Sequence, residues 1–193
     1  MVSIALSTAA RQRGASMIEV LVTMVIIAFG LLGMAGLQMR MQSSEMESYQ
    51  RSQALLLLSD MANRMAVNRT AVLAGSYNVA ATAPIGPTTD CAGLAGGTPT
   101  TVQRDLSDWC SALQGAAEAS GSSKVGAMIG GRGCIENIGN DYMITVAWQG
   151  LTPISAPAAS VGCGLNAYDA TSGGCVNDLC RRTVTTLVRI GTL

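Results

Sequence analysis

The apolar and polar positions of the chain predict one long helix at its N-terminal end. Residues 20–37 form a mostly apolar run without a charged residue, and residues 50–65 carry apolar residues at helical spacing with polar ones on the other side. No proline occurs from residue 15 to residue 73. We therefore expect a single helix over residues 15–73, with Gly75 as its stop.

The two halves of this predicted helix differ in where their apolar residues lie. The first half is apolar on all sides, which is typical of a helix buried in lipid or among similar helices. The second half has one apolar stripe, which predicts packing against a single domain. The stripe consists of Ala54, Leu58, Met61 and Met65, with Leu55 and Ala62 beside it.

Residues 74–193 have the pattern of a small, loop-rich domain, because they hold all five prolines and 18 of the 22 glycines. Alternating apolar residues predict strands over residues 142–149 and 182–190, with a short third strand over 134–138. In the first strand Tyr142, Ile144, Val146 and Trp148 share one face, and in the second Val184, Val188 and Ile190 do so.

The rest of this domain has weaker signals. Residues 106–114 are expected to be helical, with Ser107 or Asp108 as the N-cap, and residues 77–101 and 115–133 are expected to be loops. Together these elements predict an α+β fold in which the long N-terminal helix packs against a small antiparallel sheet with disulfide-tied loops.

The cysteine pattern indicates disulfides in an oxidising compartment. All six cysteines lie in the C-terminal part, namely Cys91, Cys110, Cys134, Cys163, Cys175 and Cys180. Six cysteines allow several pairings, and the sequence alone does not select one. With no histidine and no close pair of cysteines, we expect no metal site and no cofactor.

Composition and charge exclude several classes of function. The chain has 193 residues, only 12% of them charged, and a formal net charge of zero, so no basic surface is expected to bind nucleic acid. The absence of histidine removes Ser-His-Asp and Cys-His nucleophiles. We therefore expect a protein that is not an enzyme.

A carboxylate stands at the start of the apolar run. Glu19 directly precedes residues 20–37 and follows a short basic segment that contains Arg11 and Arg13 and ends in Gly14. A charge at the centre of a membrane helix costs at least about 2.5 kcal/mol and costs less near its end, so Glu19 is expected to have a partner. Two plainer interpretations are a secretory signal peptide and an acid that stabilises a helix N-terminus by about 0.3–1 kcal/mol.

The basic segment, Gly14, the Glu19 offset and the uncharged run together resemble the class III signal of type IV pilins and pseudopilins. The resemblance implies that prepilin peptidase cuts between Gly14 and Ala15 and methylates the new amine of Ala15, although the family usually has Phe at that position. It also implies that Glu19 pairs with the N-terminal amine of a neighbouring subunit and sets its axial register.

The same resemblance divides the chain into a cleaved leader of residues 1–14, a helix of residues 15–73 and a periplasmic head of residues 74–193. The helix segment from Val20 to Leu37 would serve in the membrane and in assembly. Within it, Gly30, Gly33 and Gly36 offer either a packing groove or a segment that stretches when the subunit joins a filament. Many major pilins carry a proline where this chain has Gly36.

Three further segments resemble PilV-type minor pilins, also called pilus modification proteins. They are Met17-Ile-Glu-Val-Leu-Val22, Ile144-Thr-Val-Ala-Trp-Gln-Gly150 and Cys180-Arg-Arg-Thr-Val184. This resemblance implies a minor pilin that acts in pilus initiation and assembly at or near the tip and supports twitching motility and adhesion. The implied partners are prepilin peptidase, other minor pilins and the major pilin through helix packing, and a tip adhesin.

The implied location is the inner membrane, crossed once with the head in the periplasm, and then the pilus at the cell surface. Two alternatives stay open: a minor pseudopilin of a type II secretion system, and a membrane-anchored binding module or adhesin. In the second alternative the loops at 74–133 or 152–174 would bind a ligand. Asn166 and Asp169 offer oxygens for calcium there, but two such groups are a weak calcium signal.

Overall fold

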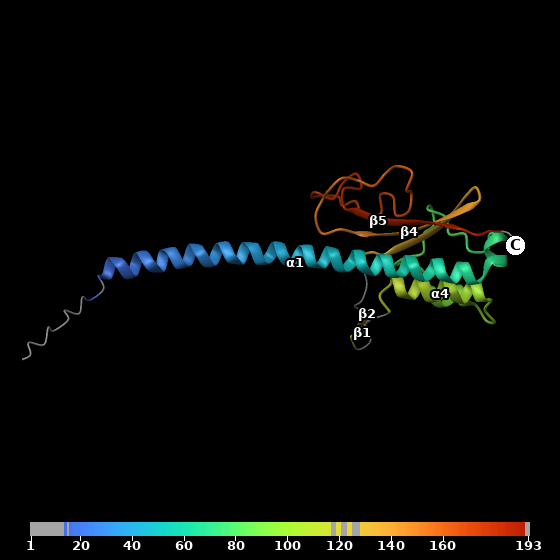
Figure 1. Cartoon of the computed structure of the whole chain (residues 1–193), viewed down its shortest axis with the longest axis horizontal. Coiled ribbons are helices and arrows are strands. Elements are labelled where there is room, and N and C mark those ends of the chain that lie inside the picture. Colours follow the sequence, from blue (N-terminus) through green and yellow to red (C-terminus); the bar gives the residue numbers. More distant parts are fainter. Residues whose placement is uncertain (1–13, 15, 117–118, 121–122, 125–127, 192–193) are drawn as a thin grey trace, which may run out of the picture. The chain divides into compact units, whose positions relative to one another are not determined.

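The computed structural model describes residues 14, 16–116, 119–120, 123–124 and 128–191 (Figure 1). Its internal contacts divide the chain into two compact units, Met1–Ser44 and Glu45–Leu193. The first unit contains the N-terminal part of helix α1. The second unit, which we call the head, contains the rest of α1 and all other described elements, and it holds the core.

Helix α1 runs from Met17 to Val67 over 51 residues, without a break at its glycines. It ends earlier than expected, because Asn68 leaves the helical conformation with φ −103° and ψ 51°. The Asn68 side chain donates a hydrogen bond of 3.1 Å to the hydroxyl of Tyr77. A short helix α2, Arg69–Leu73, follows this break. The prediction of one helix over residues 15–73 is therefore wrong at its C-terminal end.

Gly75 ends the helical region as expected. It has φ +74°, a conformation that glycine adopts without strain. Its N–H donates to the carbonyl of Val72 at 2.8 Å, and the N–H of Ser76 donates to the carbonyl of Ala71 at 3.0 Å. These two bonds form a Schellman motif, which satisfies carbonyls at the helix end that would otherwise lack a partner.

The head contains a three-stranded antiparallel sheet in the order β3, β4, β5. Strand β3 is Arg132–Ile138, β4 is Asp141–Gln149 and β5 is Arg181–Arg189. The predicted strands are thus correct to within two residues. All four residues of the predicted β4 face are buried in the main core, namely Tyr142, Ile144, Val146 and Trp148.

Two predicted loops contain regular structure. Residues 77–101 include helix α3, Cys91–Ala95, and residues 115–133 include the small hairpin of β1, Ala119–Ser120, and β2, Ser123–Lys124. Helix α4, Thr101–Leu113, begins earlier than expected, so the predicted N-cap at Ser107 or Asp108 is wrong. Thr100 is the N-cap, and its side chain and that of Gln103 form a capping box.

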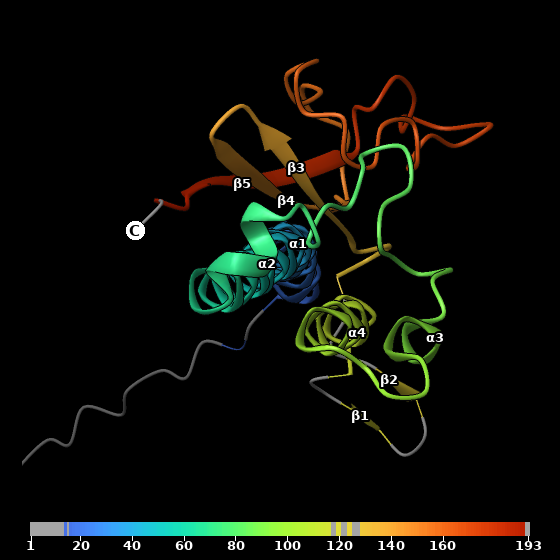
Figure 2. The ribbon, with the colours of Figure 1, turned by 90° about the vertical axis from the view of Figure 1, so that its right-hand side faces the viewer.

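The core surrounds the part of α1 that lies in the head. Figure 2, a view along α1, shows the sheet on one side of this helix and α4 on another. Met61 and Met65 of α1 are fully buried, as is Trp109 of α4. The indole N–H of Trp109 donates to the carbonyl of Leu57 at 3.0 Å, which ties α4 to α1. A Cβ at Gly133 would lie 2.3 Å from the Trp109 ring, so the close packing of α4 on β3 needs glycine there.

A smaller apolar cluster lies on the other face of the sheet and contains Cys134, Ala147, Cys163 and Tyr168. Three disulfides hold the loops: Cys91–Cys110, Cys134–Cys163 and Cys175–Cys180. They account for the cysteine pattern, and their pairing was not decided by the sequence. The long N-terminal helix, the small antiparallel sheet and the disulfide-tied loops confirm the α+β, pilin-like fold class.

Candidate processing and assembly site

The residues around the expected cleavage point lie directly before α1. Gly14 is exposed, and Ala15 lies outside the described residues. Ser16 accepts hydrogen bonds through its carbonyl from the N–H groups of Glu19, at 2.9 Å, and Val20, at 3.3 Å. These bonds start the helix, so Glu19 lies in its first turn. The positive end of the helix dipole lies there and favours a carboxylate.

The Glu19 carboxylate is exposed and has no ion-pair partner among the described residues of the chain. A carboxylate in this position beside an apolar surface is costly to bury alone, but a cation from outside the chain would offset that cost. The site therefore offers one acidic group at the end of an apolar helix for a partner of opposite charge.

The part of α1 in the first unit presents apolar side chains on all sides. Every residue from Met17 to Ser44 is exposed except the half-buried Ser43. The exposed set includes 16 large apolar side chains, among them Phe29 at 71% and Leu32 at 69% exposure. By length and composition, α1 is the one helix in the described part of the chain that could cross a membrane.

The three helix glycines lie on this exposed part of α1. A Cβ added at Gly30, Gly33 or Gly36 would meet no atom within 4 Å. The glycines are therefore not needed for any contact within the described chain. Val20 and Leu37, which bound the expected membrane segment, are 46% and 66% exposed.

In the head, an ion-pair cluster joins α1 to α4. Arg64 contacts Asp60 on its own helix at 2.9 Å, and it contacts Asp105 at 3.0 Å and Asp108 at 3.3 Å on α4. The Tyr77 hydroxyl donates to Asp105. Burial and this hydrogen bond raise the pKa of Tyr77 to about 12. The cluster fixes the position of α4 and has the geometry of a structural contact.

A second polar network holds the loops around residues 161–181. Arg181, only 1% exposed, pairs with Asp178 at 3.1 Å and donates to the carbonyls of Val161 at 2.6 Å and Cys163 at 3.1 Å. Asp169 accepts the N–H of Asp178 at 2.8 Å.

The calcium alternative at this loop has no support from the described residues, where no three acidic, His or Cys side chains gather around a possible metal. Asp169 accepts a backbone N–H there, and Asn166 donates its own backbone N–H to Asp178 at 2.8 Å.

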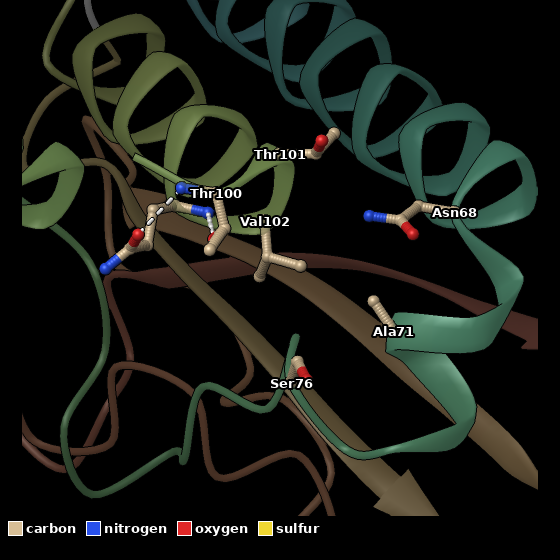
Figure 3. A pocket seen from close by; sticks show the side chains of 7 residues that line it. Asn68, Ala71, Ser76, Thr100, Thr101 and Val102 are labelled. Carbon is tan, nitrogen blue, oxygen red and sulfur yellow. Dashed lines mark hydrogen bonds between the residues drawn. The ribbon is translucent and has the colours of Figure 1, made fainter. Parts of the chain in front are cut away.

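An open pocket of about 510 Å³ lies between the α1–α2 break and the start of α4. Figure 3 shows Asn68 and Ala71 on one side of it and Thr101 and Val102 on the other, with Ser76 at its base. No charged side chain of the described residues lines the pocket. Its lining offers hydroxyl groups, side-chain amides and small apolar contacts.

Sequence reasoning missed several of these contacts. The capping box of α4 had a signal, because Thr100-Thr-Val-Gln103 fits the Ser/Thr-x-x-Glu/Gln spacing. The long-range contacts of Arg64 and Arg181 had no such signal. Asp105 and Asp108 lie 41 and 44 residues from Arg64, and the carbonyls of Val161 and Cys163 lie 20 and 18 residues from Arg181.

Comparison with known families gives two matches that follow one another along the chain. Residues 9–35 match the prokaryotic N-terminal methylation motif, and residues 36–119 match the type IV pilin Tt1218 family. No curated protein and no solved structure gives a significant match.

The two matches run without a gap from residue 9 to residue 119, and the fold around them is pilin-like. The chain therefore belongs to the type IV pilin family. The finer resemblance to PilV-type minor pilins is not confirmed by these matches.

Membership in the type IV pilin family explains why the N-terminal part of α1 is apolar and exposed. A methylation motif implies processing by prepilin peptidase and assembly with other pilins. The apolar N-terminal helix fits a membrane-anchored pilin that later enters the pilus. The family is structural rather than enzymatic.

Proposed function

We propose that the chain is a minor pilin of the type IV pilus, which acts in pilus initiation and assembly at or near the tip and supports twitching motility and adhesion. The observation that carries this proposal is the methylation motif at residues 9–35 on a helix whose first part is apolar on all sides and exposed. Such a surface needs either lipid or similar helices around it.

The proposal includes the processing step and the domain boundaries. Residues 1–14 are the leader, residues 15–73, which hold α1 and α2, are the membrane and assembly segment, and residues 74–193 are the periplasmic globular part of the chain. Prepilin peptidase cuts between Gly14 and Ala15 and methylates the amine of Ala15. Before assembly the chain crosses the inner membrane once, and positive residues of the leader keep its N-terminus in the cytoplasm.

Glu19 sets the axial register of the subunit. Its carboxylate pairs with the N-terminal amine of a neighbouring subunit, and in the low dielectric of a helix bundle such a pair is attractive over a long range. A subunit out of register leaves a buried charge without a partner, which costs several kcal/mol. The exposure of Glu19 and its lack of a partner among the described residues support this role.

The partners in this proposal are prepilin peptidase, other minor pilins and the major pilin, the last two through the α1 surface. The exposed Gly30, Gly33 and Gly36 are where neighbouring helices approach most closely, because small residues allow close backbone contact. A tip adhesin is a further partner.

The test is the intact mass and N-terminal sequence of the protein from membranes with and without prepilin peptidase. We expect a methylated chain that begins at Ala15, found only when the peptidase is present. Gly14→Val should abolish cleavage, whereas Gly36→Ala, a control glycine substitution outside the leader, should leave it intact. An uncut chain, or one cut within residues 35–40, would contradict the proposal and favour an anchored or secreted binding module.

Pilus and secretion roles are separated by a second measurement. If the chain is a minor pilin, it is present in pili sheared from cells, and its deletion abolishes twitching while type II secretion continues. A minor pseudopilin gives the opposite pair of results.

A further inference from the structure

The contact between α1 and the rest of the head changes in character along the helix. Residues 54–65 bury four apolar side chains, whereas residues 45–53 bury one side chain, and that one is polar, Gln50. The four apolar residues are Ala54, Leu58, Met61 and Met65. Burial of apolar surface is the main favourable term in packing, so the 45–53 segment gains little from it.

A polar contact holds the 45–53 segment to the head instead. The Glu47 carboxylate pairs with the guanidinium of Arg182 on β5 at 3.3 Å, and it accepts the backbone N–H of Leu151 at 3.1 Å. Among the charged residues of α1 that the structure describes, Glu47 is the first along the chain to pair with another element. We call this contact of Glu47 with Arg182 and Leu151 the latch.

The Arg182 guanidinium is itself held in place. It donates to the carbonyls of Thr152 at 2.6 Å and Leu179 at 3.1 Å, which lie near the two ends of the loop between β4 and β5. A Cβ at Gly150 would lie 2.6 Å from the guanidinium carbon, so glycine leaves room for it there. The Arg182 side chain is only 12% exposed, so its pair with Glu47 is partly shielded from water and salt.

Two buried polar groups near the latch have no hydrogen-bond partner among the described residues. They are the side-chain oxygen of Gln50 and the indole N–H of Trp148. Gln50 follows Glu47 by three residues, and residues at this spacing are neighbours on a helix surface. Trp148 is the cross-strand partner of Arg182, and directly paired residues project from the same face of a sheet. Opening of the interface here gives both groups water as a partner, which lowers the free energy of opening.

Farther along α1 the corresponding polar groups are paired. The indole N–H of Trp109 donates to the carbonyl of Leu57 at 3.0 Å, and the hydroxyl of Tyr142 donates to the carbonyl of Val72. These bonds add to the apolar burial of residues 54–65. Local opening occurs where buried apolar contacts are few, so the interface should open first at the 45–53 segment.

We propose that the latch is a conformational switch. It holds the 45–53 segment against the head in the separate subunit, and it opens when the subunit enters a filament, while residues 54–65 stay packed. The segment leaves the head as an intact helix of about two and a half turns. Neighbouring helices shift the equilibrium, because they contact the freed helix face only in the open state. The inference rests on the proposed function, since the change accompanies assembly.

The test compares hydrogen exchange at the two indole N–H groups, followed by NMR on the full chain in detergent micelles. The chain has two tryptophans, so each N–H is a separate probe. Trp148 reports on the latch and Trp109 on the part of the interface that stays packed. In the parent we expect faster exchange at Trp148 than at Trp109, although the two side chains are 3% and 0% exposed.

The variant Glu47→Ala removes the carboxylate of the latch and leaves β5 and its loops unchanged. Exchange at Trp148 should become at least about tenfold faster, because hydrogen bonds to a charged group are lost, and exchange at Trp109 should not change. The matched control is Glu45→Ala, because Glu45 is an exposed acid on the same helix without an ion pair among the described residues. It should change neither rate.

The variant Gln50→Leu tests the opposite direction. Leucine removes the buried oxygen that has no partner in the described chain, so the closed state becomes more favourable. Exchange at Trp148 should slow, and the amount of the chain in sheared filaments should fall. Glu47→Ala should enter filaments at least as well as the parent.

Two results on the purified chain would overturn the latch: equal Trp148 rates in Glu47→Ala and Glu45→Ala, or an increase at Trp109 as large as that at Trp148. If the parent is cut after Gly14 and enters filaments, an unchanged filament level of Gln50→Leu overturns the role in assembly. If the parent is not cut after Gly14, the proposed function fails and the role in assembly fails with it, whereas the indole rates still decide whether the latch exists.

Discussion

The two parts of α1 belong to one continuous helix but have opposite surroundings. From Met17 to Ser44 no residue is buried, although 16 of the side chains are large and apolar. In the remainder, only one stripe is buried: Gln50, Ala54, Leu58, Met61 and Met65. The part with the greater apolar content thus makes the fewer contacts within its own chain.

The difference shows that the arrangement of apolar residues identifies the partner of a helix. A stripe matches one neighbouring surface, and the head supplies that surface. Apolar residues on all sides match an apolar surrounding, because full burial of a large aliphatic side chain is worth about 1.5–3 kcal/mol. The first part of α1 can gain that free energy only from lipid or from other helices.

The largest expected effect is a loss of filament assembly without a loss of stability of the head. Glu19→Leu should reduce the amount of the chain in sheared filaments by at least about tenfold, since a lost charge pair of several kcal/mol exceeds the 1.4 kcal/mol of a tenfold change. The melting temperature of the head should not change. Glu45→Gln, an exposed acid on the same helix, is the control. Filament levels that are equal in the two variants would contradict the register role.

The second prediction contrasts burial in the two parts of α1. Met61→Ala should lower the free energy of unfolding of the head by about 2–5 kcal/mol, because Met61 is fully buried. Ile27→Ala, at a position that is 59% exposed, should not change it. Urea unfolding in detergent can be followed by fluorescence, because both tryptophans, Trp109 and Trp148, lie in the head core. Equal losses in the two variants would refute the contrast.

The third prediction ranks the disulfides of the head. The bridge Cys134–Cys163 spans 29 residues and Cys175–Cys180 spans 5. In the chain-entropy model, replacing both cysteines of the longer bridge by serine should cost about 1.4 kcal/mol more than replacing those of the shorter one. Tryptophan fluorescence in urea measures both losses, and helicity of the N-terminal part should persist in detergent. A larger loss for the shorter bridge would mean that local packing outweighs loop entropy.

The fourth and smallest effect appears only in alkali. Burial and the hydrogen bond to Asp105 raise the pKa of Tyr77 to about 12 from the usual 10. The folded head therefore keeps a proton that the unfolded chain loses, so this stabilisation is complete below pH 10 and disappears as the pH rises to 12. Tyr77→Phe should flatten the dependence of unfolding free energy on pH in that window. If this dependence on pH is the same in the variant, other titrating groups cause it.

Sequence-based prediction was most accurate for elements that turn one apolar face toward one packing surface. The β4 face of Tyr142, Ile144, Val146 and Trp148 was predicted residue by residue, because alternate residues of a strand share a face. In α1 the predicted stripe residue Ala54 is buried, but Leu55 beside it remains 49% exposed, because it lies outside the arc that the head covers.

Misses occurred where a contact between distant residues decided the local conformation. The helix breaks at Asn68, whose side chain binds Tyr77, and no local proline or glycine marks that point. Helix α3 lies in a segment whose content of Ala, Gly, Thr and Pro predicts a loop, and the side chain of Asp90 caps this helix. The buried Arg181 is stabilised by carbonyls that only folding brings to it.

At the candidate site the sequence supplied nearly everything that is known. Gly14, Glu19 and the apolar run that follows define the methylation motif through their order along the chain, and the roles proposed for them await the experiments above. The structure adds that Glu19 lies in the first turn of α1 and that the helix glycines face open space.

The sequence by itself determined the long helix, the change in its surroundings and the two main strands, because hydrophobic periodicity is a local property that does not depend on the partner. Only the tertiary structure decided the disulfide pairing, the place of α4 beside α1 and the backbone pairing of Val79 and Ile85 with β3. Each of these depends on which distant segments meet, and that is settled by the packing of the whole head.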